Sequence, residues 1–204
     1  MDFSLSEEQS MIQDIARKFS VAELAPAAAD LDKGSDRKTL LTNLRKLAEL
    51  GFMGLNIDAK YGGTEAGSIA FSLAITEIAR GCASTAVTTS VTNMVAEVIQ
   101  AVGNDHQKNT YLPKLCSGEF PAGAFCLTET GAGSDPSGMK TSAIRDGDTW
   151  VLNGSKQFIT SAEYAGVYVL WAVTDSAARK GKGISCFLIP ADRAGISVAS
   201  AEHK

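Results

Sequence analysis

The chain has 204 residues, of which 45% are hydrophobic, and this is enough to build a sizeable core in one large domain or two small ones. Its formal net charge is −4 and no stretch concentrates Lys and Arg among aromatic residues, so we expect no nucleic-acid partner. The longest apolar run, residues 168–173, is too short to span a bilayer, and the start lacks the pattern of a secretory signal. These features predict a cytoplasmic protein without a membrane span.

The first two helices are predicted from apolar residues at helical spacing. Such residues recur every three or four positions within 11–19 and again within 40–47. Ser4, followed three residues later by Glu7, predicts a capping box at the start of the first helix. Gly51 predicts the end of the second, because glycine readily adopts the left-handed conformation that closes many helices.

Three more helices are predicted before residue 120. Residues 68–80 and 86–102 are rich in alanine and small hydroxyl side chains, which permit close helix packing. A shorter helix is predicted at 106–112, and it should end before Pro113 because the residue preceding a proline disfavours helical backbone.

After Pro121 the pattern becomes that of β-structure. Segments rich in β-branched and aromatic residues predict strands, and Asp-Gly-Asp at 146–148 predicts a hairpin turn. Helices followed by strands, without alternation, predict the α+β class. We expect an all-helical domain at residues 1–120 and an antiparallel β-barrel-like domain at 121–204. The predicted strands are 125–128, 141–145, 150–160, 167–174 and 184–190.

The four cysteines are widely separated and include no Cys-x-x-Cys pair. Neither of the two histidines has the spacing of a zinc ligand. We therefore expect free thiols in a reducing compartment and no metal site.

A glycine-rich loop at 125–138 is the strongest candidate for a binding site. Its glycines allow close approach of a ligand to backbone N–H groups, and Thr128 and Ser134 offer hydroxyls. An ordinary hairpin turn is the alternative. Pro136 stands where a dinucleotide-binding fingerprint requires its third glycine, and no Gly-Lys-Ser/Thr of a phosphate-binding P-loop follows.

Two motifs in this region resemble the acyl-CoA dehydrogenase family. The family pattern Thr-Glu-x-x-x-Gly-Ser-Asp-x-x-Gly is matched by residues 128–138, from Thr128 to Gly138. About thirty residues later, 153–160 resembles the family's second flavin-facing strand. The acidic first helix, the Tyr-Gly-Gly loop at 61–63 and Gly-Glu at 118–119 extend the resemblance over essentially the whole chain.

The resemblance implies an FAD-dependent oxidoreductase. Members oxidise the α,β C–C bond of an acyl-CoA to trans-2-enoyl-CoA, transfer hydride to flavin N5 and pass electrons to an electron-transferring flavoprotein, and they form homodimers or homotetramers. Among enzymes, the alternative is an acyl-CoA oxidase or a flavin monooxygenase on the same fold. The alternative from a different functional class is a noncatalytic binding or assembly chain.

The resemblance also implies site residues. Ser134 would contact the flavin phosphate or acyl-CoA, and the acyl pocket would include Ser90 and Met94, whose sizes suggest a short or medium acyl chain. Without the resemblance, the apolar members of the flavin set would be interpreted as core residues. The implied flavin-binding residues are Phe125, Leu127, Thr128, Gly133, Ser134, Phe158, Ile159 and Thr160.

No residue matches the family's catalytic base. The family carries that glutamate in a further helical domain, so the chain resembles either a fragment of a dehydrogenase or a natural truncation. Glu129 and Asp135 are expected to fix the loop, not to act as acid and base. Many relatives have Trp in place of Phe158, and Asn or Gly in place of Ser161.

Overall fold

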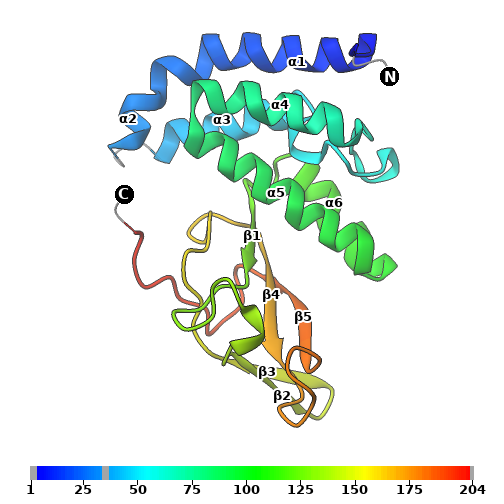
Figure 1. The fold of residues 1–204 in the computed structure, drawn as a ribbon, viewed down its shortest axis with the longest axis vertical. Coiled ribbons are helices and arrows are strands. Elements are labelled where there is room, and N and C mark those ends of the chain that lie inside the picture. The colour runs from blue at the N-terminus through cyan, green and yellow to red at the C-terminus, as the bar shows by residue number, and fades with distance from the viewer. Residues whose placement is uncertain (1–3, 34–36, 203–204) are drawn as a thin grey trace. The chain divides into compact units, whose positions relative to one another are not determined.

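The computed structural model describes residues 4–33 and 37–202. Two compact units follow one another along the chain, the first ending at Gly123 and the second beginning at Ala124 (Figure 1). The first unit is helical, and the second contains one β-sheet.

The first unit is built around α4 (Gly67–Gly81), which packs between α1 (Glu7–Phe19) and α5 (Ala83–Val102). After α1 the chain passes through a π-helical turn and a 3-10 turn to the short α2 (Ala28–Asp32). The remaining helices are α3 (Arg37–Glu49) and α6 (Asp105–Cys116). All the helices predicted from the sequence are present, with α5 beginning three residues earlier than expected.

The capping box of α1 lies two residues beyond the predicted position. Gln9 N donates to Ser6 Oγ at 3.1 Å, and Ser6 N donates to Gln9 Oε1 at 3.0 Å. The prediction of Ser4 with Glu7 is therefore wrong. The same three-residue spacing recurs at Ser6 and Gln9, and this frame places Glu7 and Glu8 in the first turn, where they complement the helix dipole.

The end of α6 also differs from the prediction, because the helix continues past Pro113 to Cys116. Leu112, Leu115 and Cys116 are all buried, and this packing outweighs the backbone hydrogen bond that a proline cannot donate. Gly51, by contrast, follows α3 with φ +82° as predicted.

A buried asparagine on α5 holds the segment between α3 and α4. Asn93 is 0% exposed, its Oδ1 accepts from Leu55 N at 2.8 Å, and its Nδ2 donates to Phe52 O at 2.9 Å and Thr89 O at 3.0 Å. Residues 52–55 form a tight 3-10 turn and cannot satisfy these groups through a regular helix. The side chain therefore substitutes for missing backbone partners.

The second unit contains a five-stranded mixed sheet, and the prediction of an antiparallel barrel is wrong. β2 pairs with β3 and β4 with β5 in antiparallel fashion, but β2 and β4 run parallel and meet at the single pair Ser142↔Val173. The order β1-β4-β2-β3, with β5 also on β4, does not close upon itself in the described residues. The strands are β1 (Gly123–Cys126), β2 (Ser142–Asp146), β3 (Thr149–Asn153), β4 (Val167–Val173) and β5 (Ile184–Pro190).

Only residues 150–153 of the long strand predicted at 150–160 are present. β3 ends at Asn153, and residues 154–160 form a loop instead of the second flavin-facing strand expected from the resemblance. Phe158 (φ +58°) and Ser161 (φ +67°) have left-handed backbone, which cannot continue a strand. The hairpin turn was predicted correctly, since Asp146 pairs with Thr149 across a two-residue loop.

No helix within residues 4–33 and 37–202 is long and apolar enough to cross a membrane. All four cysteines are free thiols. Burial raises the pKa of the Cys116 thiol to about 11 and that of Cys126 to about 12, so both remain protonated and unreactive near neutral pH. No group of three or more metal-ligating side chains occurs in the described part of the chain.

Candidate functional site

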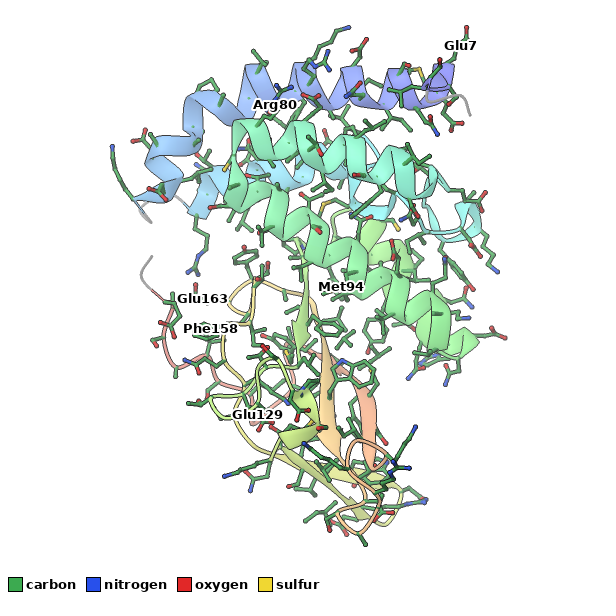
Figure 2. The ribbon with its side chains drawn as sticks, viewed as in Figure 1. Glu7, Arg80, Met94, Glu129, Phe158 and Glu163 are labelled. Carbon is green, nitrogen blue, oxygen red and sulfur yellow. The ribbon has the colours of Figure 1, made fainter. Side chains whose placement is uncertain are left out.

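The two motifs singled out in the sequence lie side by side in the second unit. Gln157 N donates to Thr128 O at 2.9 Å, which joins the segment after β1 to the loop after β3. Phe158 follows directly and exposes 69% of its surface (Figure 2). The residues predicted on either side of a flavin thus belong to one continuous hydrogen-bonded region.

A buried ion pair lies beneath this region. Lys156 Nζ is 2.9 Å from Glu129 Oε1, and the two side chains are only 7% and 10% exposed. The same Nζ donates to Leu127 O at 3.0 Å. Lysine and glutamate are almost never buried unless they are paired. The burial of both side chains therefore depends on the ion pair between them.

Glu129 also anchors the strand that leads into β2. Its Oε2 accepts from Lys140 N at 2.6 Å and its Oε1 accepts from Thr141 N at 3.0 Å. Burial acts to raise the pKa of the Glu129 carboxyl, but its interactions with Thr141, Lys140 and Lys156 outweigh it and lower the pKa to about 2. The expectation that Glu129 fixes the loop is confirmed.

Asp135 fixes the far end of the same loop. Its Oδ1 accepts from Ser137 N at 3.1 Å and from the Ser137 hydroxyl, and its Oδ2 lies 2.7 Å from Lys180 Nζ. The hydrogen bond from Lys180, followed by those from Ser137, lowers the pKa of Asp135 to about 2. The expectation that Asp135 fixes the loop is confirmed.

The glycine-rich loop contains a tight turn and an open surface. Glu129 and Ala132 exchange backbone hydrogen bonds of 3.2 and 3.0 Å, as in the hairpin turn considered as an alternative. Gly131, Gly133 and Ser134 are exposed, and a Cβ added at either glycine would meet no atom within 4 Å. The turn therefore leaves room for a ligand to approach its backbone.

The remaining predicted flavin residues divide between core and surface. Phe125, Leu127 and Thr128 are half-buried, and the Phe125 ring lies 6.1 Å from that of Trp171. Ile159 packs against the core cluster that includes Ala124 and Cys126. The alternative interpretation of Phe125 and Ile159 as packing residues thus has support in their contacts.

The region nevertheless fits an aromatic cofactor with a polar edge. Phe158 presents an exposed ring, and the buried Ser161 Oγ has no hydrogen-bond partner in the described structure. A non-glycine residue with left-handed backbone and an unsatisfied buried hydroxyl both cost free energy, which is typical of functional sites. The exposed ring, the unpartnered hydroxyl and the open glycines are compatible with a planar aromatic ligand that also carries polar groups.

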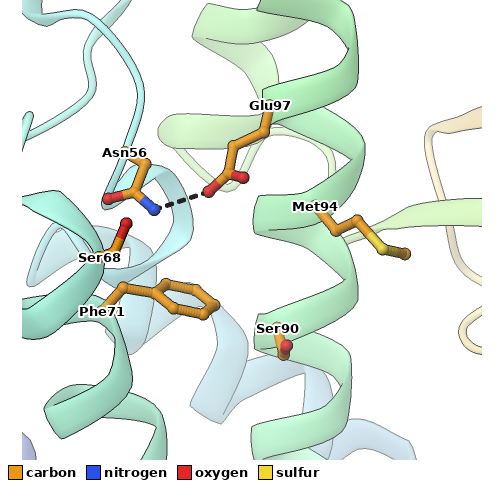
Figure 3. Close-up of a pocket in the computed structure, with 6 residues that line it drawn as sticks. All are labelled: Asn56, Ser68, Phe71, Ser90, Met94 and Glu97. Atoms are coloured by element: carbon orange, nitrogen blue, oxygen red, sulfur yellow. Dashed lines mark hydrogen bonds between the residues drawn. The ribbon is translucent and has the colours of Figure 1, made fainter.

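A second candidate site lies in the first unit, between α4 and α5 (Figure 3). The pocket has a volume of about 300 Å³ and contains both predicted acyl-binding residues, Ser90 and Met94. Its far wall is polar, because Asn56 Nδ2 donates to Glu97 Oε1 at 2.7 Å. The lining residues are Asn56, Ser68, Phe71, Ser90, Met94 and Glu97.

Sequence reasoning missed Lys156 and the polar wall of the pocket. Glu97 follows Ser90 and Met94 at helical spacing, so the helix face was available as a signal. Asn56 lies outside any helix or strand, and Lys156 is 27 residues from Glu129, so neither neighbourhood could be found from a local pattern.

Known proteins with similar sequences and structures share both units. Residues 6–119 match the acyl-CoA dehydrogenase N-terminal domain, and residues 124–204 match the middle domain of the same family. The chain is 40% identical to the short/branched chain specific acyl-CoA dehydrogenase of Bos taurus, with 98% of the chain and 46% of that protein covered. It is 36% identical to the short-chain specific acyl-CoA dehydrogenase of Clostridium acetobutylicum, covering 100% of the chain and 53% of that protein.

Among solved structures, a glutaryl-CoA dehydrogenase from Mycobacterium smegmatis in complex with FADH2 superposes with a TM-score of 0.89 at 31% identity. The match covers 98% of this chain and 50% of that one. The chain thus spans about half the length of the relatives it matches. With both domain matches and the paired motifs in agreement, the chain belongs to the acyl-CoA dehydrogenase family.

Proposed function

We propose that the chain supplies the flavin-binding and acyl-binding parts of an FAD-dependent acyl-CoA dehydrogenase that converts an acyl-CoA to its trans-2-enoyl-CoA. The observation that carries this proposal is the Gln157–Thr128 hydrogen bond, which unites the two motifs expected to contact flavin. When bound, FAD accepts the hydride that leaves the β-carbon. The protein has to supply a site for the ring and a pocket for the acyl chain.

The ring of FAD would lie against the second unit. Phe125, Leu127 and Thr128 would line one side of the site, and 158–160 would cover another part, with the exposed Phe158 contributing an aromatic face. Gly133 and Ser134 would bind phosphate oxygens through backbone N–H and hydroxyl groups. FADH2 in the similar glutaryl-CoA dehydrogenase supports this assignment.

The acyl chain would enter the pocket between α4 and α5, where Ser90 and Met94 face it. The polar Asn56–Glu97 pair disfavours a long hydrocarbon tail, because an alkyl chain that covers the half-buried carboxylate removes its solvation. The names of the Bos taurus and Clostridium acetobutylicum relatives point to short or branched chains. We infer a short or medium acyl group.

No described residue is assigned as the catalytic base. Glu129 is a buried carboxylate within the first motif, but its oxygens are occupied by Lys156 and two backbone amides. A carboxylate with a pKa of about 2 is also too weak a base for removing a carbon-bound proton. By analogy with the family, we propose an electron-transferring flavoprotein as acceptor and a homo-oligomeric state.

The test is an anaerobic titration of the FAD-loaded chain with acyl-CoA thioesters from C4 to C16, followed through the flavin absorption spectrum. We expect the largest spectral changes with C4 to C8 and little response to C16. Strongest binding of C16 would contradict the assignment of the pocket. Rapid reoxidation in air of chemically reduced flavin would favour the oxidase or monooxygenase alternative.

A further inference from the structure

The geometry points to Lys156 as a positioning residue that, with Glu129, sets the backbone of the flavin-facing segments. We use the name Lys156 clasp for these two side chains and the backbone groups they bind, at Leu127, Lys140 and Thr141. This inference rests on the proposed flavin site and adds a role for two residues that do not themselves contact the ligand.

The clasp joins three segments that are distant in the sequence. Lys156 Nζ bonds Leu127 O at 3.0 Å and Glu129 Oε1 at 2.9 Å, so one ammonium group spans the segment between β1 and the glycine-rich turn. Glu129 in turn receives the amides of Lys140 and Thr141, at 2.6 and 3.0 Å. The loop after β3, the glycine-rich turn and the approach to β2 are thereby fixed to one another.

The clasp directly adjoins both groups of predicted flavin residues. Leu127, which Lys156 binds, precedes Thr128, and the Thr128 carbonyl receives Gln157 N at 2.9 Å. Gln157 lies between Lys156 and Phe158, whose φ is +58°. A shift of the lysine would therefore move both edges of the site and release the backbone that holds Phe158 in its left-handed conformation.

The charges of the clasp are satisfied within the protein. Both side chains are at least nine-tenths buried, and Met139 Sδ lies 3.9 Å from the ammonium group as a further weak contact. A buried ion pair adds little net stability compared with apolar residues, because desolvation offsets the attraction, but it selects one arrangement of its partners. The ion pair can therefore fix the geometry of a binding site while adding little net stability.

The test separates positioning from stability by means of two variants. Lys156→Met removes the ammonium group and leaves Glu129 buried without its counter-charge, which destabilises the fold. The double variant Lys156→Met with Glu129→Gln removes both charges, so we expect its thermal midpoint to recover toward that of the wild type. Lys46→Met is the matched control, since it breaks a 2.7 Å ion pair with Glu23 in the helical unit.

Two measurements are made on the same 204-residue proteins. Amide hydrogen exchange by NMR should show Gln157 N–H exchanging about tenfold faster or more in the double variant, with the amides between β4 and β5 unchanged. FAD titration should show about tenfold weaker binding or more in the double variant and unchanged binding in Lys46→Met. Recovered stability with persistently weak binding is the signature of a positioning role.

Wild-type exchange at Gln157 in the double variant, or wild-type FAD affinity, would overturn the inference. Failure of the wild-type chain to bind FAD would instead count against the proposed flavin site, and exchange at Gln157 would still decide whether the clasp holds this backbone. If Lys156→Met does not fold, the double variant alone carries the comparison, because it contains no unpaired buried charge.

Discussion

Two residues in the connection between β3 and β4, Phe158 and Ser161, have left-handed backbone although neither is glycine. Such a conformation costs about 1–2 kcal/mol for a residue with a Cβ. Phe158 is exposed, but Ser161 is buried and its hydroxyl has no partner in the described residues. At Ser161 both the left-handed backbone and the unsatisfied hydroxyl therefore lower the stability of the fold.

Replacing Ser161 with glycine should stabilise the second unit by about 1 kcal/mol. Relief of left-handed strain and loss of the unsatisfied hydroxyl outweigh the extra entropy of glycine in the unfolded chain. Urea denaturation followed by circular dichroism measures the change. Ser155→Gly, at an exposed position without positive φ, should be neutral or destabilising, and a destabilised Ser161→Gly protein would refute this explanation.

The ionisation of Glu129 predicts a loss of stability in acid. Its pKa is lowered from 4.5 to about 2, so its contribution is fully present above pH 4.5 and is lost as the pH falls toward 2. In Glu129→Gln the stability difference between pH 5 and pH 3 should be smaller than in the wild type. Urea midpoints at these two pH values provide the check, and an equal difference would show that the clasp does not control the pKa of Glu129.

The sequence predicted the loop-fixing roles of Glu129 and Asp135 because both belong to one short motif. It did not predict Lys156, since nothing local distinguishes a buried lysine from an exposed one, and its partner lies 27 residues away. For Ser161 the sequence indicates only that many relatives have Asn or Gly at this position. The backbone conformation of Ser161 depends on tertiary contacts that residue identity does not reveal.

At the scale of elements, α5 connects the pocket to the interior of the helical unit. Ser90 and Met94 line the pocket, whereas Thr89 and Asn93, on the adjoining face of the helix, are fully buried. The helix was predicted from its composition, and its pocket-lining residues from the resemblance. The hydrogen bonds of Asn93 with Leu55 and Phe52 join residues that are 38 and 41 positions apart in the sequence, so no local pattern predicts them.

Asn93→Ala should destabilise the helical unit by about 3 kcal/mol. The change leaves Leu55 N–H and Phe52 C=O buried without their partner, and each unsatisfied group costs about 1–3 kcal/mol. Chemical denaturation gives the free energy of unfolding. Asn109→Ala, which removes an exposed side chain bonded to Asp105 O of its own helix, should cost less than about 1 kcal/mol. Equal losses in the two variants would contradict this role for Asn93.

The strands show where element-scale prediction fails. Four of the five lie within about two residues of their predicted bounds, because β-branched and aromatic runs mark them. The sheet is mixed and not an antiparallel barrel, since strand composition does not encode pairing direction. The predicted strand at 150–160 stops at Asn153, and the left-handed backbone of Phe158 is incompatible with a strand in the remainder.

At the scale of the whole molecule, family membership follows from two matched domains in sequence order. The second unit contributes the glycine-rich turn, the exposed Phe158 and the Lys156 clasp, and the first contributes the α4–α5 pocket. The proposed function requires the second unit to form a site for the ring of FAD.

The most direct measurement is the visible absorption spectrum of the purified chain, incubated with FAD and freed of excess cofactor by gel filtration. We expect flavin bands to elute with the wild-type protein and with Lys46→Met, and to be much weaker with Lys156→Met combined with Glu129→Gln. A folded wild-type protein that emerges without flavin bands would contradict the proposed flavin site.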